Sequence, residues 1–384
     1  MEKEKDLFEI TATTFLGLEE VLAKELETIG AKNILIKNRA VSFHGDNEIL
    51  YSACYKVRTA LKILKTIDKF RITDANSLYD KAFEIKWNNF FNVRKTFSID
   101  TVVKSTLFNH SNFVGLKVKD AIADKFRALY DKRPSVDTDS PDIKIIVHLS
   151  NDFCTISLDA SGETLFKRGY RAKPTAAPLN EVLTAGILGL TEWDKKTTLL
   201  DLMCGSGTIP IEASLLSMNV PSGYLRTDYS FQNWKDYDEV LWNDVKEKYN
   251  SLITTSNVEI IANDIDKEVL TIARLNSRTT KIENNIKFFN QDFFEFSNQE
   301  NCLLIINPPY DERVKSDNVN DFYKRIGDKL KQSFTGSTAW VLSGNLEAIK
   351  HIGLKPSKRI TLFNGSIECK LLKFELYSGT KRQG

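Results

Sequence analysis

The 384-residue chain is poor in metal-binding and disulfide-forming side chains. It has four histidines and five cysteines, and no two cysteines stand in a C-x-x-C pair: Cys54, Cys154, Cys204, Cys302 and Cys369. Such wide separations disfavour both a structural zinc site and a disulfide framework. We therefore expect no metal cofactor.

Long hydrophobic runs are lacking too. No segment has the roughly 18 uncharged apolar residues of a transmembrane helix, and the first residues, MEKEKDLFEI, are charged where a signal peptide would be apolar. We expect a cytoplasmic protein with no membrane partner. The composition, 42% hydrophobic and 27% charged, is typical of folded domains, and the length predicts two or three of them.

The chain has only a small excess of positive charge, and this charge is unevenly distributed along the sequence. The formal net charge is +2, whereas residues 51–173 hold 22 Lys and Arg against 14 Asp and Glu. Such a region is typical either of a nucleic-acid-binding surface or of ordinary solvated helix faces. Charge alone leaves both interpretations open.

The first part of the chain mixes strand and helix patterns. Residues 8–15 and 40–45 alternate as strands do, and residues 17–30 predict an amphipathic helix closed by a glycine. Residues 117–132 predict a second helix, and residues 142–161 predict two strands joined by a short turn. The residues of the second helix that we expect to face inward are Val118, Ala121, Ile122, Phe126 and Leu129.

Beyond residue 179, strands alternate with helices, which predicts a mostly parallel sheet covered on both faces. The predicted strands are 198–203, 258–264, 286–292, 302–308 and 338–344, with helices at 267–277 and 321–334. Residues 359–377 instead form two β-rich runs around Asn364-Gly365, a strong hairpin signal. The fold class is therefore α/β, and the terminal hairpin is not part of the dehydrogenase arrangement.

A glycine-rich turn follows the first of these strands. Asp201 stands near the strand end, and Gly205, Ser206 and Gly207 lead into a helix, where backbone N–H groups can approach a ligand closely. Pro210 occupies the position of the third glycine in a dinucleotide fingerprint, so a pyrophosphate site is disfavoured. The turn better fits an amino-acid-bearing nucleoside, with its ammonium near Asp201 and its carboxylate at the N–H groups.

Two more carboxylates follow the next two strands. Asp264 can accept hydrogen bonds from two ribose hydroxyls and Asp292 from an adenine amino group, because ligands of open α/β sheets lie across the carboxyl ends of the strands. Taken singly, each is more often a helix cap or turn residue, which is the role we predict for Asp266. Three strand-end carboxylates beside a G-x-G turn favour the ligand role.

The strand that begins at Cys302 ends abruptly in Asn307, Pro308, Pro309 and Tyr310, because proline has no N–H for a sheet. Residues 198–310 resemble the class I S-adenosylmethionine-dependent methyltransferases, and these four residues resemble the motif of the branch that methylates amino nitrogens. The resemblance implies that the Asn307 side-chain oxygen and the Pro308 carbonyl accept hydrogen bonds from a base's exocyclic amine. The Tyr310 ring would stack on the base.

An aryl amine needs such a site because its lone pair is delocalised into the ring. Two fixed acceptors can hold both N–H groups and direct the lone pair at the sulfonium methyl. The structural alternative is that Asn307-Pro308 forms a turn without a catalytic role. Methylation of a cytosine carbon would require a nucleophilic cysteine, and neither Cys204 in the turn nor Cys302 in the strand suits that role.

The resemblance implies S-adenosylmethionine (SAM) as the cofactor. The stretch that contains Leu179 and Asn180 would help to cover the methionine end of the cofactor. The full set of cofactor-binding residues expected is Leu179, Asn180, Asp201, Cys204, Gly205, Ser206, Gly207, Asp264, Ile265, Asp292 and Phe293.

The resemblance extends over nearly the whole chain. GLEEVLAKEL, LKVKDAIADKFR and FKRGYRAKPTAAPLNEVLTAGIL are similar to THUMP-domain methyltransferases akin to the bacterial 23S rRNA guanine-N(2) methyltransferase. In such proteins a ferredoxin-like part and the THUMP fold grip structured RNA, which would account for the basic region. The domains implied are a ferredoxin-like part at 1–50, a THUMP RNA-binding domain at 51–162, a connection at 163–180 and a methyltransferase domain at 181–384.

Several features have two interpretations. The basic residues Arg58, Lys167, Arg168 and Arg171 are expected RNA contacts, although the last three can instead form salt bridges at the domain junction. The aromatic insert 222–242 is either a lid that stacks on RNA or the packing of a long insertion. Asp311 replaces a glycine found in many relatives. Some relatives continue into a second methyltransferase module, whereas this chain stops soon after Tyr377, so one active site is expected.

The predicted function is methyl transfer from SAM to an exocyclic amino nitrogen in RNA, at guanine N(2) of 23S rRNA or of a ribosomal assembly intermediate. Adenine N(6) in RNA or DNA and guanine in tRNA stay open, because the same four residues can serve any planar amine. A non-catalytic RNA-binding ribosome assembly factor is the alternative from another class. The intact run 307–310 and the three carboxylates disfavour it, and Pro210 and the terminal hairpin contradict a dehydrogenase.

Overall fold

The computed structural model describes residues 7–108, 110–173, 178–281, 285–309 and 319–377. The chain forms two compact units, each of which it enters more than once. Unit 1 contains residues 1–13, 23–165 and 227–248, and unit 2 contains residues 14–22, 166–226 and 249–384. Among the described residues, no helix is both long and apolar enough to span a bilayer.

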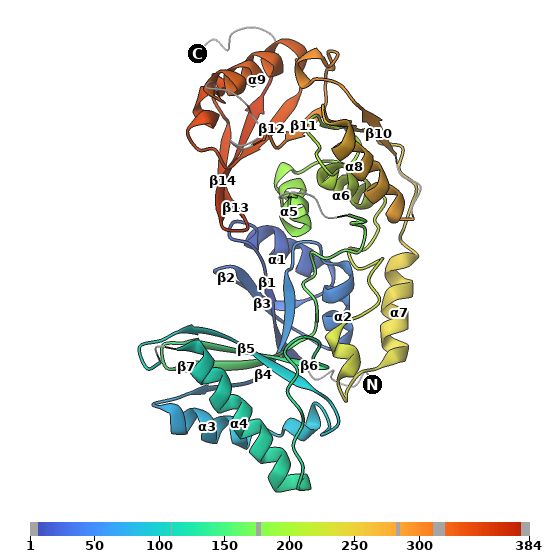
Figure 1. Cartoon of the computed structure of the whole chain (residues 1–384). Helices are drawn as coiled ribbons and strands as arrows, with labels where there is room; N and C mark the ends of the chain where they lie inside the picture. Colours follow the sequence, from blue (N-terminus) through green and yellow to red (C-terminus); the bar gives the residue numbers. More distant parts are fainter. Residues whose placement is uncertain (1–6, 109, 174–177, 282–284, 310–318, 378–384) are drawn as a thin grey trace. The chain divides into compact units, whose positions relative to one another are not determined.

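Unit 1 is built on one seven-stranded sheet with the strand order β2-β3-β1-β4-β7-β6-β5 (Figure 1). Its strands are β1 (Phe8–Thr13), β2 (Lys32–Lys37), β3 (Ala40–Gly45), β4 (Lys62–Arg71), β5 (Phe97–Lys104), β6 (Ile143–Ser150) and β7 (Phe153–Asp159). Its helices are α2 (Asn47–Lys56), α3 (Ala75–Glu84) and α4 (Ser111–Tyr130), with 3₁₀-helices η1 (Trp87–Asn89) and η2 (Ser230–Asn233). Helices α1 (Glu19–Thr28) and α7 (Glu239–Asn250) have residues in both units.

The antiparallel pair β1–β4 joins the N-terminal strands to those of the basic region, so both parts share one sheet. The predicted strands at 8–15 and 40–45 and the two strands within 142–161 are confirmed as β1, β3, β6 and β7. Strand β2 was not predicted. It lies at the edge of the sheet with five of its six residues exposed, so its sequence carries no alternation of buried and exposed side chains.

Helix α4 is longer than the predicted segment and begins at Ser111. Figure 1 shows it beside α3, which it contacts. Four of the five residues expected to face inward, Val118, Ala121, Ile122 and Phe126, are buried. The expectation was wrong for Leu129, which is 47% exposed because it lies in the last turn of the helix, next to the equally exposed Tyr130.

From residue 227 on, the aromatic insert packs into unit 1, whereas its first tyrosine, Tyr224, is exposed. The Phe231 ring is fully buried and stacks on Tyr51 with a centroid distance of 4.5 Å, and Trp242 meets both rings edge-on. Tyr229 and Trp234 are also buried. This geometry favours the packing interpretation of the insert over a lid that stacks on RNA.

Unit 2 holds a second seven-stranded sheet, with the order β10-β9-β8-β11-β12-β14-β13. Its strands are β8 (Leu199–Asp201), β9 (Ile260–Asn263), β10 (Ile286–Phe289), β11 (Leu303–Ile306), β12 (Thr338–Ser343), β13 (Lys358–Asn364) and β14 (Ile367–Glu375). Its helices are α5 (Glu181–Thr191), α6 (Thr208–Ser217), α8 (Lys267–Thr279) and α9 (Val319–Ser333), with 3₁₀-helices η3 (Phe293–Glu295) and η4 (Ala348–Ile352).

The first five strands of this sheet, from β10 to β12, are parallel, and β14 and β13 close it as an antiparallel hairpin. This confirms the predicted α/β architecture. The turn is displaced by one residue from the expected Asn364-Gly365, because Asn364 pairs with Ile367 and leaves Gly365 and Ser366 as the loop. Gly365 has φ of 64°, as the first loop position of a type II′ turn requires.

Strand β11 shows why the parallel region reads as a continuous apolar run. Leu303 and Ile305 pack into a core with α5 and α6, whereas Leu304 and Ile306 pack into a second core with α9. Figure 1 shows α9 alongside β12 at the red end of the chain. Both faces of the strand are buried, so every side chain along it must be apolar.

Candidate functional site

Three polar residues lie at the ends of adjacent strands, along the carboxyl edge of the unit 2 sheet. Asp201 is the last residue of β8, Asp264 directly follows β9 and Asn307 directly follows β11. The strands are parallel neighbours in register, with Asp201 opposite Ala262 and Leu304 opposite Leu200. Strand β8 therefore lies between β9 and β11 at the topological switch point, where open α/β sheets bind ligands.

The turn after β8 is open on its ligand side. Gly205 has φ of 53°, and a Cβ added there would meet nothing within 4 Å. Its N–H donates to Asp264 Oδ2 over 2.8 Å, and Asp264 Oδ1 accepts from the Asp266 N–H over 2.9 Å. Helix α6 starts directly after Gly207, and no side chain among the described residues caps it, so its first N–H groups can donate to an anionic group.

Asp201 is a buried carboxylate with little local compensation. It is 1% exposed, and its one hydrogen bond among the described residues is a long one, 3.3 Å, from the Met203 N–H. Burial, reinforced by the charge of Asp264, raises the pKa of Asp201 well above its ordinary value. A buried carboxyl in this state favours either a proton or a cationic ligand. It therefore fits the ammonium role predicted from the sequence.

The two cysteines of this region, Cys204 and Cys302, are buried and poorly suited to act as nucleophiles. Burial raises the pKa of the Cys204 thiol well above its ordinary value and also raises the pKa of Cys302, so neither forms a thiolate readily. Cys204 packs with Ala262 and Leu270, and Cys302 lies in the core beside α9. This geometry agrees with a packing role for both.

The third strand-end carboxylate lies farther from its strand than expected. Strand β10 ends at Phe289, so Asp292 stands three residues beyond it and caps η3, where it accepts from the Phe294 N–H over 2.9 Å. Phe293 is 4% exposed and belongs to the core beside α9. Ile265, by contrast, is 69% exposed next to Asp264, where it can cover a planar ring. Asp266 caps α8 as predicted, accepting from the N–H groups of the two residues that follow Lys267.

Two buried asparagines that the sequence did not single out hold the edge together. Asn263 Nδ2 donates to the carbonyls of Leu202 and Gln291 over 3.1 and 3.0 Å, which ties the ends of β8 and β10 to β9. Asn276 Nδ2 donates to the Ser206 carbonyl over 3.0 Å, and both asparagines are fully buried. A buried amide is recognisable from its contacts, which sequence spacing does not disclose.

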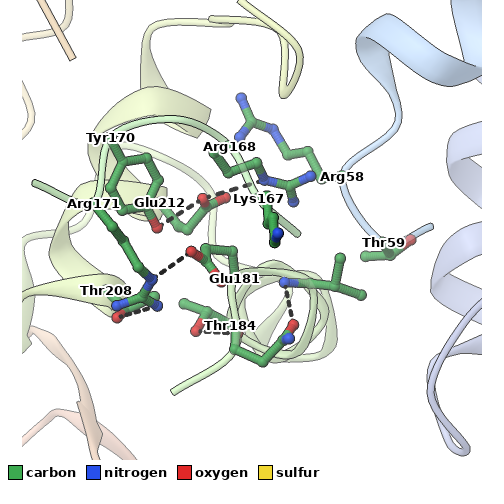
Figure 2. Close-up of polar contacts among 12 residues, drawn as sticks. Arg58, Thr59, Lys167, Arg168, Tyr170, Arg171, Glu181, Thr184, Thr208 and Glu212 are labelled. Atoms are coloured by element: carbon green, nitrogen blue, oxygen red, sulfur yellow. Dashed lines mark hydrogen bonds and ion pairs between the residues drawn. The ribbon is translucent and has the colours of Figure 1, made fainter. Parts of the chain in front are cut away.

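The expected methionine-side residues lie at the start of α5. Asn180 caps the helix, its Oδ1 accepting from the Val182 N–H over 2.9 Å. The Leu179 carbonyl accepts a hydrogen bond from Arg171 Nη2 over 2.7 Å. Arg171 Nε donates to Glu181 Oε1 over 2.6 Å (Figure 2). Arg171 thus lies at the start of α5, and it also faces the hydroxyls of Ser206 and Thr208 beside the glycine turn.

Of the other basic residues expected to contact RNA, Arg58 and Arg168 are buried and Lys167 is exposed. Arg168 is 3% exposed, and its Nε lies 3.5 Å from Glu212 Oε1, which also accepts from the Tyr170 hydroxyl (Figure 2). For Arg168 and Arg171 this geometry favours the salt-bridge interpretation over phosphate contact. Arg58 is buried as well, at 6% exposed, whereas the Lys167 side chain is exposed.

The residues expected to hold the target amine are only partly described. Asn307 and Pro309 are half-buried and Pro308 is buried, directly after the central strand β11. Tyr310 lies outside the described residues, as does Asp311. Asn307 therefore lies at the same sheet edge as the candidate cofactor residues.

The described residues fit S-adenosylmethionine. The open side of Gly205 and the α6 N-terminus suit its amino-acid end, the buried Asp201 suits its ammonium, and Asp264 has a further lone pair on each oxygen for the ribose hydroxyls. The exposed Ile265 suits one face of its adenine.

Family models match most of the chain. The RMKL-like methyltransferase domain matches residues 168–373, the THUMP domain matches residues 73–159, and the RlmL ferredoxin-like domain matches residues 9–64.

Individual relatives agree with these matches. A Synechocystis protein assigned as an RNA methyltransferase is 36% identical over 95% of this chain and 96% of its own length. A ribosomal RNA large subunit methyltransferase K/L from Syntrophotalea carbinolica is 34% identical over 95% of this chain, which spans about half the length of the K/L relatives. A crystal structure of a protein assigned as a methyltransferase, in complex with SAH, has a TM-score of 0.87 and 28% identity, covering 98% of this chain and 100% of its own. The chain therefore belongs to the RMKL-like family of THUMP-domain, class I S-adenosylmethionine-dependent RNA methyltransferases.

Proposed function

We propose that the chain transfers a methyl group from SAM to the 2-amino group of a guanine in 23S rRNA. The observation that carries the proposal is the common sheet edge of Asp201, Asp264 and Asn307, which follow three adjacent parallel strands. An amide placed one strand away from a cofactor cradle is what methylation of an amine requires.

Each side chain has a distinct role in this proposal. When bound, SAM supplies an electrophilic methyl on its sulfonium. Asp201 holds the ammonium, Asp264 the ribose hydroxyls and Asp292 the adenine amino group. Asn307 and the Pro308 carbonyl accept the two N–H groups of the target amine and orient its lone pair. The methylated amine loses its proton readily, so no dedicated base is needed.

The choice of RNA rests on the similarity to the K/L methyltransferases, whose name assigns them to large-subunit ribosomal RNA. The THUMP match and the basic region 51–173 support contact with structured RNA. We propose the domain boundaries given above, with the exposed Lys167 as a phosphate contact at the connection. The substrate is then either free 23S rRNA or a ribosomal assembly intermediate.

The test is methylation of RNA from a strain that lacks the gene. The purified protein, labelled SAM and total RNA are incubated, and the labelled nucleoside is identified after digestion. We expect N(2)-methylguanosine in 23S rRNA. Labelled N(6)-methyladenosine would assign adenine as the target base, and label confined to tRNA would assign tRNA as the substrate. SAM binding without transfer to any RNA would favour an assembly factor.

A further inference from the structure

The hydrogen bonds of the Arg171 guanidinium are short on one side and long on the side of the glycine turn. On one side its guanidinium makes two short hydrogen bonds, to Glu181 Oε1 over 2.6 Å and to the Leu179 carbonyl over 2.7 Å. On the other side it faces the hydroxyls of Ser206 over 3.5 Å and Thr208 over 3.3 Å, which are long for hydrogen bonds. The guanidinium is thus held firmly by Glu181 and the Leu179 carbonyl and only weakly by the hydroxyls of the turn. Figure 2 shows its contacts with Glu181 and Thr208.

The main chain beside Arg171 is also fixed to the turn. The Ala172 N–H donates to Asn276 Oδ1 over 2.9 Å, and Asn276 Nδ2 donates to the Ser206 carbonyl over 3.0 Å. Glu181, the anchoring carboxylate, is only 3% exposed, while the Arg171 side chain stays 24% exposed. An arginine held this way is preorganised, because it loses little side-chain freedom when a ligand arrives.

The charges at the two ends of the turn are complementary to an amino acid. Asp201, which precedes the turn, is a buried acid with no cationic partner among the described residues. Arg171 presents a cation beside Ser206 and Thr208, at the other end of the turn. Nη1 of Arg171 carries two N–H groups and makes one hydrogen bond among the described residues, the 3.5 Å contact to Ser206, so at least one N–H group can be donated to a carboxylate. A carboxylate would replace a long contact to a neutral hydroxyl by a charge-assisted hydrogen bond.

We propose that Arg171 is a cofactor-binding residue that donates hydrogen bonds to the carboxylate of SAM, with Ser206 and Thr208 beside it. This assignment rests on the proposed function and moves Arg171 from the expected RNA contacts to the cofactor site.

The test compares two ligands that differ only in this carboxylate, SAM and decarboxylated SAM, against wild type and Arg171→Gln by calorimetry. Arg171→Gln should bind SAM roughly 10- to 100-fold more weakly, the range of one lost charged hydrogen bond. Its affinity for decarboxylated SAM should change less than about threefold, because the lost partner is absent from that ligand. A purely structural arginine would weaken both ligands equally.

The matched control is Arg226→Gln. Arg226 lies in the same unit and donates over 3.0 Å to the carbonyl of Lys167, which is not a residue of the turn, so both affinities should stay at wild-type values. If Arg171→Gln does not fold by circular dichroism, Arg171→Lys is used, with a smaller but still carboxylate-dependent loss expected. Equal losses for the two ligands, or none, overturn the role of Arg171. Wild type that binds no SAM would instead overturn the proposed function.

Discussion

Replacing Asp201 with Asn should stabilise the cofactor-free protein while weakening its binding of SAM. The carboxylate is 1% exposed, accepts one long hydrogen bond and lies near the charge of Asp264. Asn keeps the shape and removes the charge. The substitution thus separates a group retained for ligand binding from one retained for folding.

The size of both effects follows from this environment. An unpaired buried charge costs several kcal/mol, so relief of even part of that cost should exceed about 1 kcal/mol. For unit 2, about 200 residues long, this corresponds to a rise of roughly 2–4 °C in melting temperature. Loss of a charged hydrogen bond to the ammonium, about 1.5–3 kcal/mol, should weaken SAM binding roughly 10- to 100-fold.

The stabilisation should depend on pH. The pKa of Asp201 is raised in the folded state, so the folded protein binds the proton more tightly than the unfolded chain. The wild type therefore loses stability as pH rises above the ordinary Asp pKa, up to the raised folded value. The advantage of Asp201→Asn should be absent in acid and should grow toward neutral pH.

Melting curves without ligand from pH 4 to 8, together with calorimetry with SAM, measure both quantities. Asp194→Asn is the control, because backbone hydrogen bonds from Thr197 and Lys196 lower the pKa of that exposed carboxyl. It should slightly lower stability above the ordinary Asp pKa and leave SAM binding unchanged. An Asp201→Asn protein that melts lower than wild type at neutral pH, or binds SAM equally well, would refute the reasoning.

Three further substitutions test other parts of the account. Asp264→Ala removes the acceptor of the Gly205 N–H and a proposed ribose contact, so SAM affinity measured by calorimetry should fall at least about 100-fold. Asp264→Asn should lose less affinity. Equal losses for the two variants would contradict a role for the negative charge of Asp264. Gly205→Ala places a Cβ on the open side of the turn, where it meets no neighbour, at a residue of positive φ. The substitution should lower the free energy of unfolding by only about 1–2 kcal/mol, measured by thermal melting, yet weaken SAM binding more than tenfold. Unchanged affinity would mean that the ligand lies elsewhere. Phe231→Ala empties a fully buried stack and should cost roughly 3–5 kcal/mol in urea unfolding of unit 1, whereas a change below about 1 kcal/mol would contradict its packing role.

The strands of the unit 2 sheet were predictable because burial and chain breaks leave a pattern in the local sequence. Strand β11 is apolar at every position since both its faces are buried, and prolines mark its end. Strand β2 was not predictable, because an exposed edge strand places no demand on its side chains. The exposure of Leu129 shows the related limit that helical periodicity does not reveal where the covering elements stop.

The positions of the candidate site residues were predictable where these residues end a strand or directly follow one. Asp201, Asp264 and Asn307 sit where the order of parallel strands requires, so sequence position alone brings them to one edge. The contacts of Arg171 with Glu181 and the glycine turn were not predictable, because partners 10 to 37 residues apart meet only through tertiary packing. The same is true of Arg168 and its buried partner on α6.

The central claim is that an amide at the end of β11 orients the target amine for the methyl donor held on the neighbouring strands. Its most direct test is the single-turnover rate of methyl transfer to RNA by Asn307→Ala at saturating SAM. We expect the rate to fall at least about 100-fold, as when one preorganised hydrogen-bonding group is removed from other enzymes, with the Kd for SAM within about threefold of wild type. A rate near that of the wild type would contradict the account.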